Sequence, residues 1–494
     1  MNDLERVTPE EVGIDSETIL KFIKSVNETG YSINSFMILR YGKIVAEAYW
    51  KPFSAELKHN LHSCSKSFTA TAVGIAVGEK RFSLDDKIID LLPEKLDNPP
   101  HKYIAAMKVK HLLKMATAFS VFVDPITDDW TKEFLNSKPD HYPGTLFGYD
   151  TSGTHTLCEI IQKFTGMTME EYLKPRLLDP IGINDIEFEV SPMGINRGGG
   201  GVRITTESMA RFGQLYLQDG VWNDKRILPE GWVKLATKRH IDDSNVTGIT
   251  GGYNGYGYNF WCLKENAFSC LGLGGQVITV IPKKDMVFVM TSNGIRQSND
   301  YYIPHELMWN IIYPAVSDKS MPANKAKYKQ LQNHISNLET FLPRGEISNP
   351  FSEVINNKRF DVEENLVGYD GFKISINEKE GTLSLFNKKN EDIVRFGMGT
   401  HILDNNPFQK YASEKQYWGQ FTFINDKNPR KRSRCGNAAI WTDERTLIIH
   451  SHLIDIVQSF VITCNFGEEA NIVQIFPFGG FSYDSLPCTI TNII

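Results

Sequence analysis

The feature of this sequence that most limits its possible folds is a change of pattern near residue 318. Long helical stretches and β-hairpin signatures precede it, whereas short alternating strands separated by Gly, Asn and Asp turns follow it. Residues 318–327, between the two patterns, are mostly polar and include one proline, which is typical of a linker. A chain of 494 residues is also long enough for more than one core. We therefore predict two domains, residues 1–318 and 319–494.

The first domain carries two hairpin signatures far apart in the sequence. In each of them two β-rich runs flank a short turn, at residues 35–50 and 277–291. Helices are predicted at 302–313 and at 63–79, a stretch that has no proline and is too long for a strand. Between about 83 and 235 the pattern is mainly helical. We predict an α/β (α+β) fold, in which an antiparallel sheet is flanked by helices and joined to a mainly helical subdomain.

The second domain is predicted to be rich in β-structure. It opens with an amphipathic helix at about 325–342, after which short alternating segments such as Gly381–Phe386 and Thr446–Ile449 indicate strands. This pattern favours an all-β module of roughly 140 residues. An all-β module can cover a cleft or pair subunits, and nothing in these residues decides between the two, so the oligomeric state stays open.

Composition and charge exclude several classes of protein. Charged residues make up 23% of the chain and hydrophobic residues 41%, as in ordinary globular proteins. Fifty-three basic against 59 acidic residues give a net charge of −6, so we expect no binding to nucleic acid or to an anionic membrane. The most apolar helical stretch, Phe68–Gly78, is about half the ~20 residues of a membrane span. The first residues lack a secretory signal pattern, so we expect a cytoplasmic protein.

No metal site is predicted. The seven cysteines are scattered and never form C-x-x-C, which argues against a zinc cluster and against a disulfide framework. His450 and His452 alternate on a predicted strand and so share a face, but no third ligand is evident nearby. The basic run Lys427–Arg434 lacks interleaved aromatic residues, so we expect a solvated hairpin loop there and not a nucleic-acid patch.

A serine and a lysine three residues apart form the first chemical motif, Ser63-Cys64-Ser65-Lys66. On a helix this spacing places both side chains on one face, so the hydroxyl and the amine can converge. A serine hydroxyl is a weak nucleophile unless a base activates it, and a lysine desolvated by its surroundings can be that base. Taken alone, S-x-x-K is short and common, and a capping serine beside a surface lysine is the plainer interpretation.

Two further motifs favour the chemical interpretation. Pro143–Gly153 is a turn-rich loop that presents Tyr149 before a helix, and a phenol near a lysine can relay a proton. Cys270–Gln276 is a Gly-rich run that leads into the second hairpin, where glycines let a sheet edge approach a substrate closely. Neither this run nor Arg197–Gly201 has the pattern of a phosphate-binding loop.

The three motifs together resemble those of the serine β-lactamase, penicillin-binding protein and related esterase family, and above all its class C-like branch. In that family a serine at the start of a helix, a tyrosine loop and a Gly-ending triad on a strand face one cleft. The resemblance covers roughly residues 8 to 315. Connecting stretches match too: Lys110–Met115, Gly200–Thr206, Ala210–Leu217 and Ile227–Val233.

The resemblance implies roles for individual residues. Ser63 is the expected nucleophile of an acyl-enzyme mechanism, with Lys66 and Tyr149 sharing general-base work and Tyr149 protonating the leaving group. The backbone N–H groups of Ser63 and Leu273 would hold the oxyanion. No metal or organic cofactor is implied. The residues expected to line the oxyanion and substrate site are Thr151, Cys270, Gly272, Leu273 and Gln276.

Two departures from the family pattern bear on the substrate. Thr151 stands where the second motif usually has Asn or Ser, which keeps a hydroxyl but loses an amide. Cys270-Leu271-Gly272 stands where the third motif usually begins with a cation and a hydroxyl residue, which meet the carboxylate of penicillin-type substrates. We therefore expect a serine hydrolase that acts on carboxylester, amide or short-peptide bonds and is weak or inactive as a true β-lactamase.

Two alternatives stay open at this point. One is a catalytically weak protein that binds peptides or cell-wall fragments without turnover, and the other is a D-amino-acid-specific peptidase. A blocked or splayed arrangement of Ser63, Lys66 and Tyr149 would favour the binding protein. Activity on D-Ala peptides without activity on simple esters would identify the peptidase.

Overall fold

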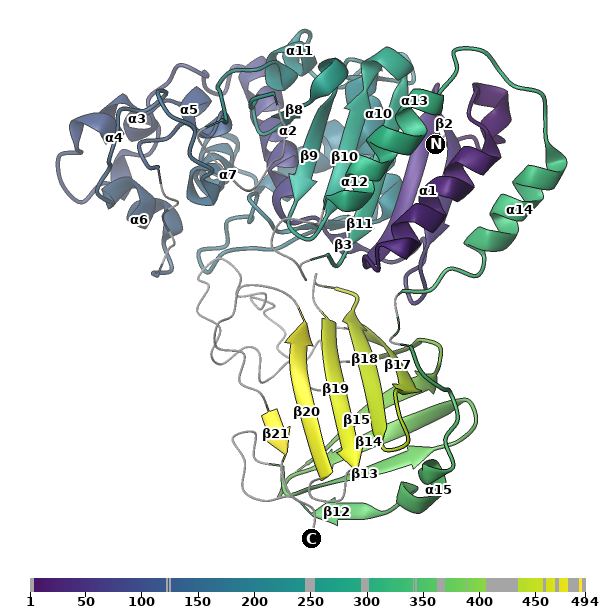
Figure 1. The fold of residues 1–494 in the computed structure, drawn as a ribbon. Coiled ribbons are helices and arrows are strands. Elements are labelled where there is room, and N and C mark those ends of the chain that lie inside the picture. Colours follow the sequence, from purple (N-terminus) through teal and green to yellow (C-terminus); the bar gives the residue numbers. More distant parts are fainter. Residues whose placement is uncertain are drawn as a thin grey trace.

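In a computed structural model of the protein, the described residues are 4–120, 123, 126–244, 254–294, 302–340, 342, 344–361, 369–388, 390–405, 434–455, 459–466, 471–478 and 488–490. They form a layered body of helices and sheet, with a curled β-sheet below it (Figure 1). This arrangement confirms the predicted fold class. The domain boundary at 318/319 stays a prediction.

A six-stranded antiparallel sheet, in the order β2-β1-β11-β10-β9-β8, is the centre of the layered body. Both predicted hairpins are present, and Ile38 of the first pairs with Phe288 of the second. This pairing joins the beginning and the end of the domain in one sheet. The strands are β1 (Ile33–Arg40), β2 (Lys43–Tyr49), β8 (Trp261–Cys262), β9 (Phe268–Gly272), β10 (Gln276–Ile281) and β11 (Met286–Ser292).

Helices cover both faces of this sheet, so its strands are apolar on both sides. Along β1, Met37 and Leu39 belong to one core, whereas Phe36 and Ile38 belong to the other. The first core is covered by α2 (Ser65–Gly78) and α10 (Thr206–Leu217). The second core is covered by α1 (Ser16–Glu28), α12 (Ile303–Leu307) and the π-helical turn η7 (Met308–Ile312).

The helices between residues 88 and 165 lie to one side of the sheet in Figure 1. They begin close to the predicted start at residue 83, and α7 packs against α2, α5 and α6. Helix α10, which falls in the predicted helical stretch, instead lies on the sheet. The remaining helices of this part are α3 (Ile88–Leu91), α4 (Lys102–Ala106), α5 (Val109–Leu113), α6 (Trp130–Asn136), α7 (Thr151–Thr165), α8 (Met169–Leu173), α9 (Asp179–Ile181) and α11 (Trp232–Thr237).

The helix predicted at about 325–342 is α14 (Lys325–Ile335), which ends earlier than expected. Its Leu331 is buried in the second core, and Lys327 forms an ion pair of 2.6 Å with Glu17 of α1. Although the prediction placed this helix in the second domain, it therefore packs on a helix of the first.

The second part of the chain is a ten-stranded sheet, as the alternating pattern predicted. Its described strands pair antiparallel except β15 and β17, which run parallel. The sheet curls so that its apolar residues, among them Phe372, Phe396 and Trp441, share one core. The strands are β12 (Arg359–Asp361), β13 (Gly371–Ile376), β14 (Glu380–Phe386), β15 (Glu391–Met398), β16 (Ile402–Asn405), β17 (Arg434–Trp441), β18 (Thr446–Leu453), β19 (Ser459–Phe466), β20 (Asn471–Phe478) and β21 (Cys488–Ile490).

The two parts meet where the segment after β2 approaches the segment after α14. Lys51 N donates to Leu338 O at 3.0 Å, and Thr340 N donates to Lys51 O at 2.9 Å. Pro52 lies against Gly436 of β17, where a Cβ atom would be only 2.1 Å from Pro52 Cγ. The junction therefore combines backbone hydrogen bonds and a small residue in the sheet with the buried apolar cluster of Phe53, Leu57 and Ile454.

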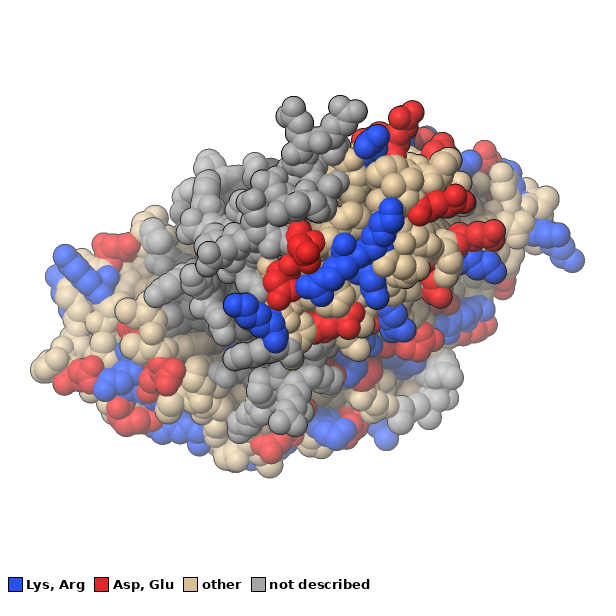
Figure 2. All heavy atoms as spheres, turned by 90° about the horizontal axis from the view of Figure 1, so that it is seen from below, with Lys and Arg blue, Asp and Glu red and all other residues tan. Residues whose placement is uncertain are grey.

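On the face of the molecule seen in Figure 2, basic and acidic side chains of the described residues are interspersed. Arg395 pairs with Asp404 at 3.1 Å and Arg434 with Asp455 at 2.7 Å, for example. Most of the predicted basic loop, residues 427–433, lies outside the described residues. Among the described helices, none combines the length and the apolar character needed to cross a membrane. The six cysteines whose side chains are described are buried free thiols.

Replacing Phe22 should test how α1 is held on the sheet. The ring of Phe22 lies edge-on to Phe36 and Phe288, with centroid distances of 5.3 and 5.9 Å. We expect Phe22→Ala to lower the free energy of unfolding by about 3–5 kcal/mol, because it removes a fully buried ring. The neighbouring exposed Lys21→Ala should change it by less than about 0.5 kcal/mol. Urea unfolding followed by tryptophan fluorescence measures both, and equal effects would refute the packing account.

Candidate active site

Ser63 lies in the 3₁₀ turn η2 (His62–Cys64), directly before α2. The chain enters this turn from β3 (His59–Asn60), which pairs with β5 (Val202–Ile204). His62 adopts a φ of 45°, a left-handed conformation that is uncommon for a residue with a Cβ atom. Its N–H donates to Asn60 Oδ1 at 2.8 Å, which fixes the bend. Ser63 is thereby held half-buried between fully buried neighbours.

Lys66 lies one helical turn from Ser63, as the spacing predicted. Its Nζ donates to Ser63 Oγ at 3.2 Å and to Gly199 O at 2.6 Å. The side chain is only 1% exposed. Burial disfavours the ammonium form and lowers the pKa of Lys66 to about 7, although the nearby Asp150 carboxylate acts in the opposite direction. Lys66 can therefore both lose and gain a proton near neutral pH.

Tyr149 and Asp150 complete the surroundings of this lysine. Lys66 Nζ lies 4.8 Å from the centroid of the Tyr149 ring, within cation–π distance, and the ring stacks on Trp261. Asp150 is the N-cap of α7, where it accepts from Gly153 N at 3.1 Å. Burial raises the pKa of Asp150, and Lys66 opposes that shift. The predicted proximity of lysine and tyrosine is thus present.

The run Arg197–Gly201 supplies the wall opposite α2. A Cβ atom on Gly198 would lie 2.1 Å from Thr69 Oγ1, and one on Gly199 would lie 2.4 Å from Thr151 Cγ2. Only glycine lets the backbone come this close, and the approach brings Gly199 O to Lys66. The motifs assigned no residue of this run to the site, although its four glycines were the available signal.

The third motif contributes its turn to the site, but not its first residue. Gly272 ends β9, and a Cβ atom there would lie 2.2 Å from Leu61 O, so glycine lets the strand reach the serine turn. Leu273 lines the pocket. Cys270 was expected to line the site. Its side chain is 3% exposed and packs in the first core instead, away from the pocket. Gln276 was also expected to line the site, but it is fully buried. Its Nε2 donates to Ser292 O at 2.7 Å, which joins the turn after β9 to β11.

The pocket beside Ser63 has a free volume of about 560 Å³, including the space open to solvent at its mouth. Its rim includes the predicted residues Ser63, Thr151 and Leu273. Arg197 lies within it, bonded to Glu189 at 2.6 Å and 5.6 Å from the Trp130 ring centroid. The lining residues that the motif analysis missed are His62, Trp130, Ser152, His155, Arg197, Gly199 and Gly200.

The comparison with protein families agrees with this geometry. Residues 28–302 match the model described as Beta-lactamase. The chain belongs to the beta-lactamase family. Its membership accounts for the serine turn, the tyrosine loop and the Gly-rich strand end around one pocket, and it confirms the resemblance found in the motifs.

Relatives of this chain carry the names of different hydrolases. The chain is 25% identical over 284 residues to the 6-aminohexanoate-dimer hydrolase of Paenarthrobacter ureafaciens, which covers 53% of this chain and 72% of that enzyme. It is 27% identical over 158 residues to the lovastatin esterase of Penicillium rubens, and this match covers 26% of this chain and 39% of that esterase. A solved Bacillus anthracis structure named "Putative 6-aminohexanoate-dimer hydrolase" has a TM-score of 0.52 at 21% identity, over 63% of this chain and 87% of that one. The solved structure supports the fold alone.

The lowered pKa of Lys66 predicts the pH dependence of Ser63 reactivity. If neutral Lys66 accepts the serine proton, the rate of Ser63 labelling by a fluorophosphonate should rise with pH to a plateau, with a midpoint near 7. Lys66→Arg, whose guanidinium stays protonated, should lower the plateau rate by roughly 10²–10⁴-fold. Stopped-time labelling followed by intact-protein mass spectrometry measures these rates, and a flat profile between pH 5 and 9 would contradict the role of Lys66 as base.

Two adjacent glycines provide a matched test of the wall opposite α2. Gly199→Ala must displace Thr151 or the Gly199 carbonyl that binds Lys66, so labelling should slow by roughly 10²-fold. Gly200→Ala places its methyl about 4.0 Å from the nearest atom, His62 C, and should change the rate little. Similar rates for both variants would show that the close approach at Gly199 is unimportant.

Proposed function

We propose that this protein is a serine hydrolase that cleaves carboxylester, amide or short-peptide bonds through an acyl-enzyme on Ser63. The observation that carries the proposal is the 3.2 Å contact between Ser63 Oγ and the buried Lys66 Nζ. A lysine with a pKa near 7 beside a serine hydroxyl is the arrangement that nucleophilic catalysis requires. Ser63 also lines an open pocket, so a substrate carbonyl can reach it.

The first half of the reaction follows from these positions. Neutral Lys66 takes the proton of Ser63 as Oγ attacks the acyl carbonyl carbon. Backbone N–H groups of Ser63 and Leu273, two residues that line the pocket, stabilise the oxyanion. The tetrahedral intermediate collapses when the leaving alkoxide or amine gains a proton, which passes from Lys66 by way of the Tyr149 hydroxyl.

In the second half, a water molecule attacks the acyl carbonyl carbon of the acyl-enzyme, as Ser63 did in the first half. The Lys66 amine, or the Tyr149 phenolate beside it, removes a proton from the water. Ser63 regains its proton as the acid product leaves. Asp150, which is also buried, acts to raise the pKa of Lys66 and so favours the ammonium that forms transiently in each half.

The third motif and the opposite end of the pocket bear on substrate choice. Cys270 offers no cation or hydroxyl to a penicillin carboxylate, because it lies in the core. The one arginine among the pocket-lining residues is Arg197, and Glu189 already accepts its hydrogen bond. Two relatives named a dimer hydrolase and an esterase support ester and amide bonds as the substrate class.

The observations favour this function over a protein that only binds its ligand. A binding protein would tolerate a splayed or blocked serine, lysine and tyrosine. Here Lys66 Nζ lies 3.2 Å from Ser63 Oγ and 4.8 Å from the centroid of the Tyr149 ring, and Ser63 lines the pocket. A D-amino-acid-specific peptidase would use the same residues, so substrate profiling must separate it.

Rates of hydrolysis of a small panel of ester, amide and β-lactam substrates test the proposal. The wild-type protein should hydrolyse short-chain nitrophenyl esters or aminoacyl anilides faster than the cephalosporin nitrocefin. Ser63→Ala should lose this activity by roughly 10⁴-fold or more. Cys64→Ala is the control: its thiol donates to Gln276 O inside the core, so activity should be kept. Preference for D-Ala-D-Ala peptides would identify a peptidase, and equal loss in both variants, or no turnover with any compound, would refute the proposal.

A further inference from the structure

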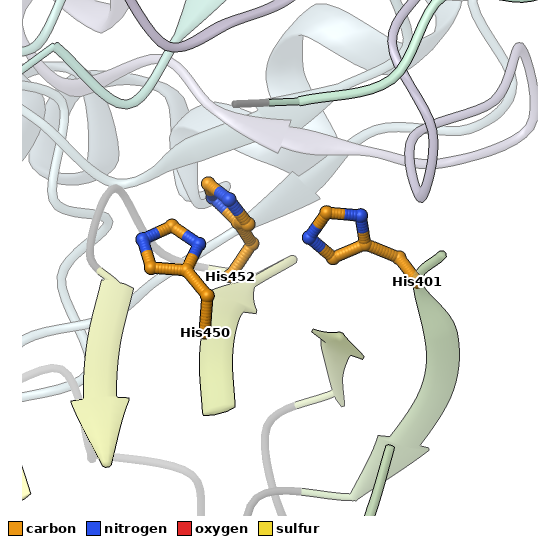
Figure 3. Close-up of side chains that lie close together, drawn as sticks. All are labelled: His401, His450 and His452. Carbon is orange, nitrogen blue, oxygen red and sulfur yellow. The ribbon is translucent and has the colours of Figure 1, made fainter. Parts of the chain in front are cut away.

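A second group of convergent polar side chains lies in the β-rich part, far from Ser63 in the sequence. His450 and His452 of β18 are joined by His401, which directly precedes β16 (Figure 3). One ring nitrogen of each lies within 4.8 Å of the others. The prediction of no metal rested on the lack of a third ligand near His450 and His452, and His401 supplies it. We call these three residues the histidine cluster.

Strand pairing explains why the three imidazoles meet. His450 and His452 share a face of β18, and their partners on β17 are Ala438 and Gly436. These small residues leave room above β17 for rings from both sides. β16 pairs with the other edge of β17, which brings His401 across to His452. The ring centroids of His401 and His452 are 5.1 Å apart, and those of His450 and His452 are 4.2 Å apart.

The surroundings suit metal binding better than solvent contact. His401, His450 and His452 are 9%, 7% and 1% exposed. Among the described residues, His401 Nδ1 has no hydrogen-bond partner, while Nε2 makes one long contact of 3.3 Å with Thr340 Oγ1.

We infer that the histidine cluster binds a divalent first-row transition metal, for which Zn²⁺ is the best-suited ion. Imidazole nitrogen is a preferred zinc ligand, and three of them with one water form a common four-coordinate shell. Zn–N bonds of about 2.0–2.1 Å set ligand nitrogens roughly 3.3 Å apart in a tetrahedral site. The separations of up to 4.8 Å in the cluster reach this value through small side-chain rotations.

The position of the site indicates a structural role at the junction. Thr340 Oγ1, beside His401, donates to Lys51 O at 3.0 Å, and Gly436, opposite His452, contacts Pro52. A bound ion would fix the turn before β16 against β18 directly beneath this segment. It would thereby stabilise the contact between the sheet and the layered part of the chain.

Zinc binding by the full-length, untagged protein tests the inference. After removal of metals with EDTA and dialysis, Zn²⁺ is titrated in competition with a chromophoric zinc indicator. We expect one Zn²⁺ per chain for the wild type and for His101→Gln, an exposed histidine outside the cluster. His401→Gln and His452→Gln should bind at least roughly 100-fold more weakly, since even outer-shell changes cost 10–100-fold.

Two further measurements keep the test decisive. Fluorophosphonate labelling of Ser63, which does not involve the cluster, verifies that each variant is folded. The visible spectrum of the Co²⁺-substituted wild type should show the bands of four-coordinate cobalt, and these should be absent from His401→Gln. If His401→Gln and His452→Gln bind Zn²⁺ as tightly as the wild type and His101→Gln do, the site does not exist. These outcomes leave the hydrolase proposal unaffected, because it is judged by Ser63 alone.

Discussion

The buried ammonium group of Lys66 is the constraint on which the active-site architecture depends. A cation removed from water needs polar partners, and here they come from separate stretches of the chain: Ser63 Oγ, Gly199 O and the face of Tyr149. Bringing these groups to one point requires close backbone approach. That requirement explains the glycine run, where a Cβ atom on Gly199 would meet Thr151. The same burial brings the pKa of Lys66 close to neutrality.

The six-stranded sheet makes this convergence possible. The pairing of β1 with β11 joins residues about 250 positions apart, and β9 and β10 follow in the same sheet. The end of β9 therefore arrives beside the serine turn, where Gly272 lies against Leu61. With helices on both faces, the sheet is a rigid support on which the position of Leu273 relative to Ser63 is fixed.

In the β-rich part, small residues again permit a close approach, here between side chains. Small residues on β17 allow imidazoles from both sides of this strand to meet under the junction, as glycines allow the backbone to meet Lys66. In both places polar groups are buried together at a point where distant segments touch. The contacts of Lys51 with Leu338 and Thr340 tie the two parts of the chain at this place.

Local patterns in the sequence determined the hairpins, the helix after Ser63, the pairing of Ser63 with Lys66 and the family, because each depends on spacing within a few residues. The extent of α14, the core position of Cys270 and the arrival of His401 beside His452 were decided only by tertiary packing. The same holds for Arg197, Trp130 and His155 in the pocket. These residues meet through strand pairing and helix packing between segments tens to hundreds of residues apart, and a single sequence carries no local pattern that records such contacts.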